Sequence, residues 1–309
     1  MKLIENKIEK LEQKYDLLGI YEQIEIAGRT AYKSLDKIEY DKNGRSKTAR
    51  AFVDKMIELG HGSPLEHGTV YLSIPYNEHI IQKYYENPYS ICNVYLYPNN
   101  DGAALWAVTT NYRVLVENNL LDDLKYLCEP TEYHEKRTTF RLTCARVQAD
   151  SFTRHRAFSF LMESTRYCNY SNGKFDNEIT VVEPTRWDDF SAVQQNLFFG
   201  AWDYAKHNYM TLIKTGVKPE DARDVLPLQL KTELIMTGTE SQWNEFFKLR
   251  ISDHAHPDAK YIAEQIKKTT MKDIIKTIKS VFTKDKNSIN VDYENKIDMV
   301  CSTIFRRVR

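Results

Sequence analysis

Residues 154–166 read Arg-His-Arg-Ala-Phe-Ser-Phe-Leu-Met-Glu-Ser-Thr-Arg, a run rich in side chains that can do chemistry. Arginine presents a planar fork of donors that matches phosphate and the oxygens of a pyrimidine. The run therefore predicts a site for an anionic small molecule. The alternative is a solvated basic helix face, but such a face does not require the carboxylate of Glu163. Three apolar residues also interleave with the charges and would bury one side: Phe158, Phe160 and Leu161.

The turn from His61 to His67, His-Gly-Ser-Pro-Leu-Glu-His, is a second candidate. Because it follows a predicted helix, it would present Ser63 and Glu66 to a ligand. Alternatively it only connects the helix to a strand, since polar turn residues usually serve the turn. The spacing of the two histidines matches no common zinc-ligand pattern, so we expect no metal here.

Arg223 and Arg250 complete the candidate residues. Arg223 lies among apolar residues near a predicted helix end, where it would bind phosphate or pair with Asp221 or Asp224. Arg250 and His254 are four residues apart and would share a helix face if the helix continues. A salt bridge to a neighbouring aspartate is the structural alternative for Arg250.

Composition and missing motifs narrow the class of protein. The sequence has no GxSxG, Walker A or GxGxxG motif, so no cofactor is expected to be held in the Rossmann manner. None of the five cysteines stands in a recognisable nucleophile context. With 43 Lys+Arg against 43 Asp+Glu the net charge is zero, which argues against a dedicated nucleic-acid-binding protein.

The same composition predicts a cytoplasmic protein. An odd number of cysteines without a CxxC pair favours reduced thiols. The first residues, Met1–Lys7, lack the apolar region of a signal peptide, and no apolar run is long enough to span a membrane. We found no repeat or linker, so a single compact unit is expected.

Hydrophobic spacing and turn residues predict mixed helices and strands. Helices are predicted at 46–60, 109–121, 146–153, 191–214, 219–225, 241–249 and 258–266, and strands at 69–74, 138–144 and 179–182. Ser191 is placed to cap one helix and Gly60 to end another. The Lys-rich tail, 267–309, is expected to be helical and peripheral.

Together these segments resemble the flavin-dependent thymidylate synthases (the ThyX type). The family signature is Arg-His-Arg, seven residues and a serine, which is met by Arg154–Arg156 followed by Ser164. Four further segments resemble family motifs in the same order: 27–32, 60–67, 222–228 and 249–255. The resemblance covers about residues 20–75 and 138–266.

The resemblance implies an α+β fold in which helices flank an antiparallel β-sheet, assembled as a homotetramer with active sites between subunits. A single catalytic domain would span residues 1–309, with an insertion at about 76–137 and a helical extension at about 270–309. No nucleic acid or membrane is expected as a partner.

The resemblance also implies an activity: reductive methylation of dUMP to dTMP, with 5,10-methylenetetrahydrofolate as carbon donor and FAD, reduced by NADPH, as hydride source. Arg250 would be the catalytic residue that polarises the uracil ring. The other implied dUMP contacts are Ser151, Arg154, Glu163, Ser164, Arg166 and Arg223. The implied FAD contacts are His61, Ser63, Glu66, Arg154, His155, Arg156, Thr239, Glu245 and His254.

Two departures from the family pattern leave alternatives open. Many relatives carry Asn-Glu at the positions of Leu161-Met162, whereas here the carboxylate comes one residue later, at Glu163. On a helix that shift turns the carboxylate by about 100°. Thr239, Ser241 and Glu245 also stand where relatives usually carry Asn and Arg. The alternatives are a flavin enzyme that hydroxymethylates or otherwise modifies a pyrimidine nucleotide, and a non-catalytic nucleotide- or RNA-binding protein.

Overall fold

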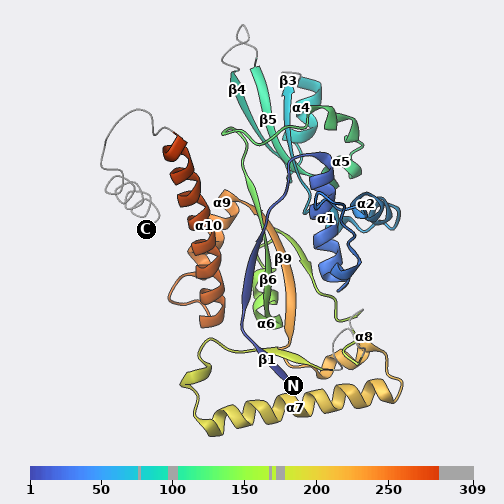
Figure 1. The fold of residues 1–309 in the computed structure, drawn as a ribbon, viewed down its shortest axis with the longest axis vertical. Helices are drawn as coiled ribbons and strands as arrows, with labels where there is room; N and C mark the ends of the chain where they lie inside the picture. The colour runs from blue at the N-terminus through green and yellow to red at the C-terminus, as the bar shows by residue number, and fades with distance from the viewer. Residues whose placement is uncertain (76–77, 97–103, 167–168, 172–177, 285–309) are drawn as a thin grey trace. The chain divides into compact units, whose positions relative to one another are not determined.

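The computed structural model of the chain describes every residue except 76–77, 97–103, 167–168, 172–177 and 285–309 (Figure 1). Residues Met1–Ile266 form one compact unit, and residues from Lys267 onward form a second. All strands of the described residues lie in the first unit. The fold is α+β with antiparallel sheets, as the sequence predicted.

A four-stranded antiparallel sheet carries the segments with the candidate residues. Its strands, in spatial order, are β2 (Lys7–Leu11), β6 (Arg137–Ala145), β9 (Lys231–Thr239) and β7 (Ser159–Met162). Because side chains alternate along a strand, Phe140 and Leu142 fall on the same face as Leu234 and Met236. This face packs against α6 (Arg146–Phe152), α9 (Glu240–Arg250) and the first turns of α10 (Pro257–Lys284). The strand predicted at 138–144 and the helices predicted at 146–153 and 241–249 are confirmed.

The other face of this sheet meets α1 (Leu17–Ala31), which contacts β7 and β9. Figure 1 shows α1 and α9 on opposite sides of β9. Helix α1 is followed by the short helix η1 (Leu35–Lys37), then by α2 (Ala49–Glu58) and α3 (Gly62–Leu65). Gly60 has a φ of +67°, the left-handed conformation that ends a helix at a glycine, so the predicted stop is confirmed.

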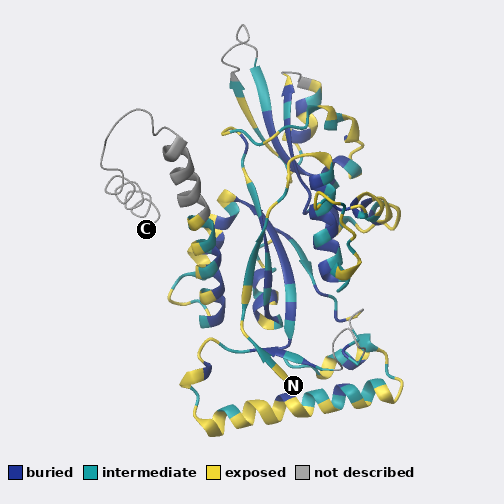
Figure 2. Ribbon diagram, viewed as in Figure 1, coloured by how far each residue is buried: buried dark blue, intermediate teal, exposed yellow. Residues whose placement is uncertain are grey.

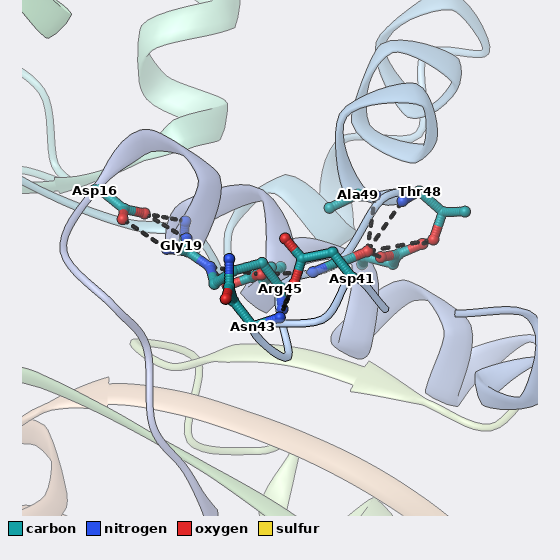
Figure 3. Close-up of polar contacts among 10 residues, drawn as sticks. Asp16, Gly19, Asp41, Asn43, Arg45, Thr48 and Ala49 are labelled. Atoms are coloured by element: carbon teal, nitrogen blue, oxygen red, sulfur yellow. Dashed lines mark hydrogen bonds and ion pairs between the residues drawn. The ribbon is translucent and has the colours of Figure 1, made fainter. Parts of the chain in front are cut away.

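The loop between α1 and α2 is fixed by a polar network (Figure 3). Arg45 donates to Asp16 at 2.7 Å and to Glu22 at 2.9 Å, while the Thr48 hydroxyl donates to Glu25 at 2.7 Å. Glu25 is fully buried, so these bonds satisfy a carboxylate that would otherwise be costly inside the fold. The network anchors the loop along the length of α1.

A second antiparallel sheet is built from β3 (Thr69–Pro75), β5 (Ala104–Asn111) and β4 (Ile91–Leu96), in the spatial order β3-β5-β4. Three short helices accompany it: α4 (Glu78–Tyr85), α5 (Tyr112–Glu117) and η2 (Leu121–Tyr126). In this sheet the strand predicted at 69–74 pairs with a strand from the segment that was expected to be an insertion. Its core includes Ile20 and Ile24 of α1, so it is packed into the first unit.

The helix predicted at 109–121 is wrong over its first residues. Thr109 and Asn111 belong to β5, where they pair with Tyr71 and Thr69 of β3. The helix starts at Tyr112, because the Asn111 side chain accepts a hydrogen bond from a backbone amide of its first turn. It ends after only six residues.

The long helix α7 (Ala192–Lys214) begins at Ser191 with a capping box, as predicted. Its apolar stripe is largely uncovered: Trp202 and Tyr209 are buried, but Val193 and Leu197 are each 70% exposed (Figure 2). Around α7 lie a parallel pair of β1 (Lys2–Ile4) with β8 (Thr180–Val182), and the short helices η4 (Trp187–Asp189), α8 (Pro219–Ala222) and η5 (Arg223–Val225).

The helical tail predicted after residue 267 is confirmed as far as Lys284, the end of α10, and its remainder lies outside the described residues. In the part of the chain that the structure describes, no helix combines the length and the apolar character needed to cross a bilayer.

Candidate functional site

The first of two groups of predicted site residues surrounds Arg250 at the end of α9. Nε of Arg250 donates to Nε2 of His155 at 2.9 Å, and a terminal nitrogen of the same guanidinium donates to the carbonyl oxygen of Ser151. The guanidinium carbon also lies 5.7 Å from the centre of the Phe152 ring. We call Ser151, Arg154, His155 and Arg250 the Arg250 group.

The Arg250 group concentrates positive charge. Burial, and then the charge of Arg250, lowers the pKa of His155, so this imidazole is a neutral acceptor at pH 7. Burial, and then the charge of Arg154, lowers the pKa of Arg250. Among the described residues no carboxylate forms an ion pair with Arg250, which rules out the aspartate salt bridge considered from the sequence.

His254 is separated from this group. Helix α9 ends at Arg250, with Ile251 as its C-terminal cap, so the helix does not continue to His254. The expectation that Arg250 and His254 share a helix face is therefore wrong, and the His254 side chain is exposed.

The second group lies between the end of β7 and η5. A terminal nitrogen of Arg223 donates to the Thr165 hydroxyl at 3.3 Å, and the Ser164 hydroxyl accepts from the Arg166 amide at 3.3 Å. Nε of Arg223 also lies 4.0 Å from a carboxylate oxygen of Asp224, at the limit of an ion pair. We call Ser164, Thr165, Arg166 and Arg223 the Arg223 group; it combines two guanidinium groups with two hydroxyls.

The two groups adjoin different elements of the fold. The Arg250 group adjoins Phe152 and Phe246, which belong to the core between the sheet and helices α6 and α9. Ser164 instead donates its amide to the carbonyl of Ala31, at the end of α1. Within one chain the two groups therefore have different neighbours: α6 and α9 for the first, and the end of α1 and η5 for the second.

The shift of the carboxylate from position 162 to Glu163 changes the direction of the side chain in a different way from the rotation expected on a helix. Residues 159–162 form strand β7 rather than a helix, and neighbouring strand residues point to opposite faces. A shift of one position therefore moves a side chain across the sheet instead of rotating it by about 100°. Met162 packs against the core beneath α6 and α9, whereas Glu163 points to the α1 side, toward Lys231.

Glu163 belongs to a buried cluster of charges. Its carboxylate lies 2.7 Å from Lys231 and 3.9 Å from Lys33, and Glu233 lies 2.9 Å and 3.2 Å from the same two lysines. Burial alone would lower the pKa of Lys231, but the two carboxylates raise it overall. The cluster lines a cavity of about 310 Å³. The structure thus engages Glu163 with lysines of its own chain.

The flavin contacts implied near α3 have polar partners. The Tyr32 hydroxyl lies 3.0 Å from Nδ1 of His61, and Arg113 donates to the Glu66 carboxylate at 2.6 Å. Ser63 is exposed at the same turn. These residues form one edge of the molecule beside the second sheet.

The remaining implied flavin contacts are scattered over the surface and α9. Arg154 and Arg156 are exposed. Thr239 caps α9, and its hydroxyl accepts from the Gln242 amide at 3.3 Å. Two neighbours on α9 are occupied elsewhere, since Ser241 donates to Glu135 and Glu245 pairs with Lys248.

Arg137 is a further candidate residue that the sequence did not reveal. Its guanidinium donates to the Ser159 hydroxyl at 3.0 Å and to the Glu66 carbonyl at 3.2 Å, so it links the turn at 61–67 to the Arg154–Arg166 segment. It also lines a cavity with Thr239. Arg137 belongs to no recognisable motif. The one sequence feature that could have pointed to it is its position one residue before a predicted strand.

Comparison with known proteins agrees with the resemblance. Residues 130–274 match the Thy1 family model, described as thymidylate synthase complementing protein. This segment contains the Arg250 group, the Arg223 group and Glu163. Over these residues, a little under half of the chain, the sequence is similar to the Thy1 family.

Relatives with a named activity share part of the chain. Flavin-dependent thymidylate synthases of Synechocystis sp., Pyrococcus furiosus and Saccharolobus solfataricus are 28%, 27% and 28% identical to it over 141, 173 and 128 residues. The alignments cover 43%, 53% and 40% of this chain, and 66%, 68% and 46% of those proteins. The chain thus spans about half to two thirds of the length of these relatives.

A solved structure also aligns with the chain. The UMP/dUMP methylase PolB from Streptomyces cacaoi, bound with 5-Br dUMP, matches 88% of this chain and 93% of its own, with 17% identity and a TM-score of 0.42.

Proposed function

We propose that this protein is a flavin-dependent enzyme that methylates dUMP to dTMP, with 5,10-methylenetetrahydrofolate as carbon donor and NADPH as reductant. The observation that carries the proposal is the Arg250 group, a guanidinium held by two neutral acceptors and lacking a carboxylate partner among the described residues. The match of residues 130–274 to the Thy1 family supports the same activity.

Arg250 is suited to activate a uracil ring. Carbon 5 of uracil is a weak nucleophile, and it becomes stronger when negative charge at a ring carbonyl is stabilised. A guanidinium already oriented by His155 and Ser151 provides that stabilisation without reorganising during the reaction. No nucleophile from the protein is needed. FAD, when bound, supplies the hydride that completes the methyl group.

The Arg223 group is suited to hold the phosphate of dUMP. Arg223 and Arg166 supply charge, and the hydroxyls of Ser164 and Thr165 supply short-range donors. Both arginines are accessible enough to meet a ligand, since Arg166 is exposed and Arg223 half-buried.

The separation of the two groups supports an active site shared between subunits. Because the first group adjoins α6 and α9 whereas the second adjoins the end of α1 and η5, we propose that one nucleotide meets arginines from different protomers. The exposed apolar stripe of α7, with Val193 and Leu197, supports association, since large exposed apolar patches mark interaction surfaces. We propose a homotetramer.

Residues near Thr239 fit a polar cofactor such as FAD. Thr239, Ala157 and Ser159 share a cavity of about 110 Å³ with Thr109, whose hydroxyl oxygen is buried and has no hydrogen-bond partner among the described residues. Buried hydroxyls are normally paired, so this one fits a site that accepts ligand oxygen or nitrogen atoms. Arg154, His155 and Arg156 would hold the cofactor at the edge of this cavity, and His61, Ser63, Glu66, Glu245 and His254 stay predicted contacts.

Two measurements test the proposal. The absorbance spectrum of purified protein should show bound flavin after incubation with FAD and desalting, and the spectrum should change when dUMP is added. Mass analysis of the product from dUMP should show a methyl group. A colourless protein that retains no FAD would contradict the proposal and favour a non-catalytic nucleotide-binding role.

One observation favours a second activity. Met162 occupies the position where relatives carry a carboxylate, and Glu163 is turned toward Lys231 instead. Loss of that carboxylate from the core face changes the chemistry available near the pyrimidine. Hydroxymethylation of the nucleotide is therefore the second candidate, and the same mass analysis distinguishes it.

A further inference from the structure

A small cavity lies where the second sheet meets the Arg154–Arg166 segment. Its volume is about 110 Å³. It is lined by Ser159, Thr239 and Arg137, by Thr109 of β5, and by Tyr89 of the turn before β4. The space exceeds the roughly 30 Å³ of one water molecule. It is smaller than the several hundred Å³ that a whole cofactor requires, so it accommodates one chemical group of a larger ligand.

The charge of Arg137 is uncompensated in this cavity. The side chain donates to three neutral oxygens, those of Ser159, Thr69 and the Glu66 carbonyl. Among the described residues no carboxylate forms an ion pair with it, because the Glu66 carboxylate is taken by Arg113. Burial lowers the pKa of Arg137 to about 10, and the nearby Tyr71 and Glu66 offset that effect only in part.

Thr109 provides a second and independent sign of a ligand. It is only 2% exposed, and within the described part of the chain its hydroxyl oxygen has no hydrogen-bond partner. A buried hydroxyl without a partner is unfavourable, and a ligand atom in the cavity would satisfy it. The N-terminus of α9 does not serve this purpose, since Thr239 and Gln242 already cap each other there.

We propose that Arg137 and Thr109 bind an electron-rich oxygen of the flavin cofactor, and that Tyr89 and Ile91 form the outer wall of its pocket. The inference rests on the proposed function, because Thr239 and the Arg154–Arg156 run are its predicted flavin contacts. None of the sequence motifs includes Arg137 or Tyr89. The second sheet thereby gains a role at the cofactor site.

The first test compares two arginines on the same face of β6. FAD binding is titrated by flavin fluorescence for the wild type, Arg137→Met and the control Arg141→Met, whose arginine pairs with Glu9 at 2.6 Å. Loss of a hydrogen bond from a charged donor should raise the Kd of Arg137→Met about ten- to a hundredfold, and leave Arg141→Met within about twofold. An unchanged Kd in a folded Arg137→Met protein would overturn the inference.

A second variant, Thr109→Val, keeps the shape of the side chain and tests the same site if Arg137→Met does not fold. Its Kd for FAD should rise about two- to tenfold, as for one neutral hydrogen bond, and no change would count against the site. Riboflavin identifies the oxygen: an equal loss with riboflavin and FAD points to a ring carbonyl, and a loss with FAD alone points to a phosphate. Wild-type protein that binds no flavin would contradict the proposed function itself.

The proposed place of Tyr89 in the outer wall of the pocket is tested by comparison with a second exposed tyrosine. Tyr89 lines the cavity and is 69% exposed, whereas Tyr85 on α4 is 74% exposed and does not line it. Iodide should quench bound flavin more strongly in Tyr89→Ala than in wild type, while Tyr85→Ala should match wild type. Equal quenching in both variants would remove Tyr89 from the wall.

Discussion

Arg250 and His155 lie 2.9 Å apart, with Nε of the arginine donating to Nε2 of the histidine. The imidazole can accept this bond only while Nε2 is unprotonated, which places its proton on Nδ1. The position of the Arg250 guanidinium, for which we propose the role of polarising the substrate, is therefore tied to the protonation state of His155.

Acidification should release Arg250. Because the pKa of His155 is held below its ordinary 6.5, the unfolded chain takes up this proton at a higher pH than the folded chain. The stability linked to His155 is therefore present above pH 6.5 and is lost as the pH falls through the lower folded pKa. His155→Gln, a non-titrating acceptor, should show a flatter fall of Tm below that pH than wild type.

The difference in Tm between wild type and His155→Gln reports on His155 alone. Burial also lowers the pKa of His67 and His134, but both remain in the variant and cancel in the difference. Identical pH profiles of Tm in the two proteins would show that His155 is not coupled to Arg250 in this way.

Removal of Arg250 should affect turnover rather than flavin binding. Arg250→Ala deletes a preoriented donor at a developing negative charge, which typically costs about a hundred- to a thousandfold in kcat. The FAD content of the purified variant should stay close to that of wild type. Lys248→Ala, on the exposed surface of the same helix, is the control, and near-normal kcat in Arg250→Ala would refute the assigned role.

Removal of Arg223 should affect dUMP affinity. Arg223→Ala takes one charged donor from the predicted phosphate site, so KM for dUMP should rise about tenfold or more with a smaller change in kcat. Arg186→Ala removes an exposed arginine outside both groups and should leave KM unchanged. Equal KM values in the two variants would argue against a phosphate contact at Arg223.

The cluster around Lys231 should matter for stability. Lys231→Met leaves Glu163, which is 1% exposed, without its closest cation, and should lower the free energy of unfolding by about 3–5 kcal/mol in urea titrations. The double variant Glu163→Leu/Lys231→Met keeps the pair of Lys33 with Glu233 and should be more stable than Lys231→Met alone. Strictly additive losses would show that the two side chains are not coupled.

Features set by neighbouring residues could be predicted from the sequence. Ser191 caps α7 and Gly60 ends α2, because both act through residues within a few positions along the chain. The Arg154–Arg166 segment stood out for a similar reason, since its unusual chemistry is contiguous. The antiparallel sheet and the family followed from several such segments in a fixed order.

Features set by distant partners could not be predicted. Thr109 reads as the start of a helix, but it pairs with Tyr71 across a strand ladder. The direction of the Glu163 side chain depends on residues 159–162 being a strand. Along a strand neighbouring side chains alternate, so Glu163 points to the opposite face from Met162. Arg137 has no motif, and its importance comes only from what the second sheet places beside it.

The segment that forms the second sheet begins and ends close to the same point of the structure. Arg137 bonds to the carbonyl of Glu66, 71 positions earlier, and to the hydroxyl of Thr69. A detour whose two ends touch can be acquired, exchanged or shortened during evolution while the strands on which the chemistry depends keep their spacing. Changes in this detour can therefore alter the surroundings of the proposed cofactor site and leave Arg223 and Arg250 in place.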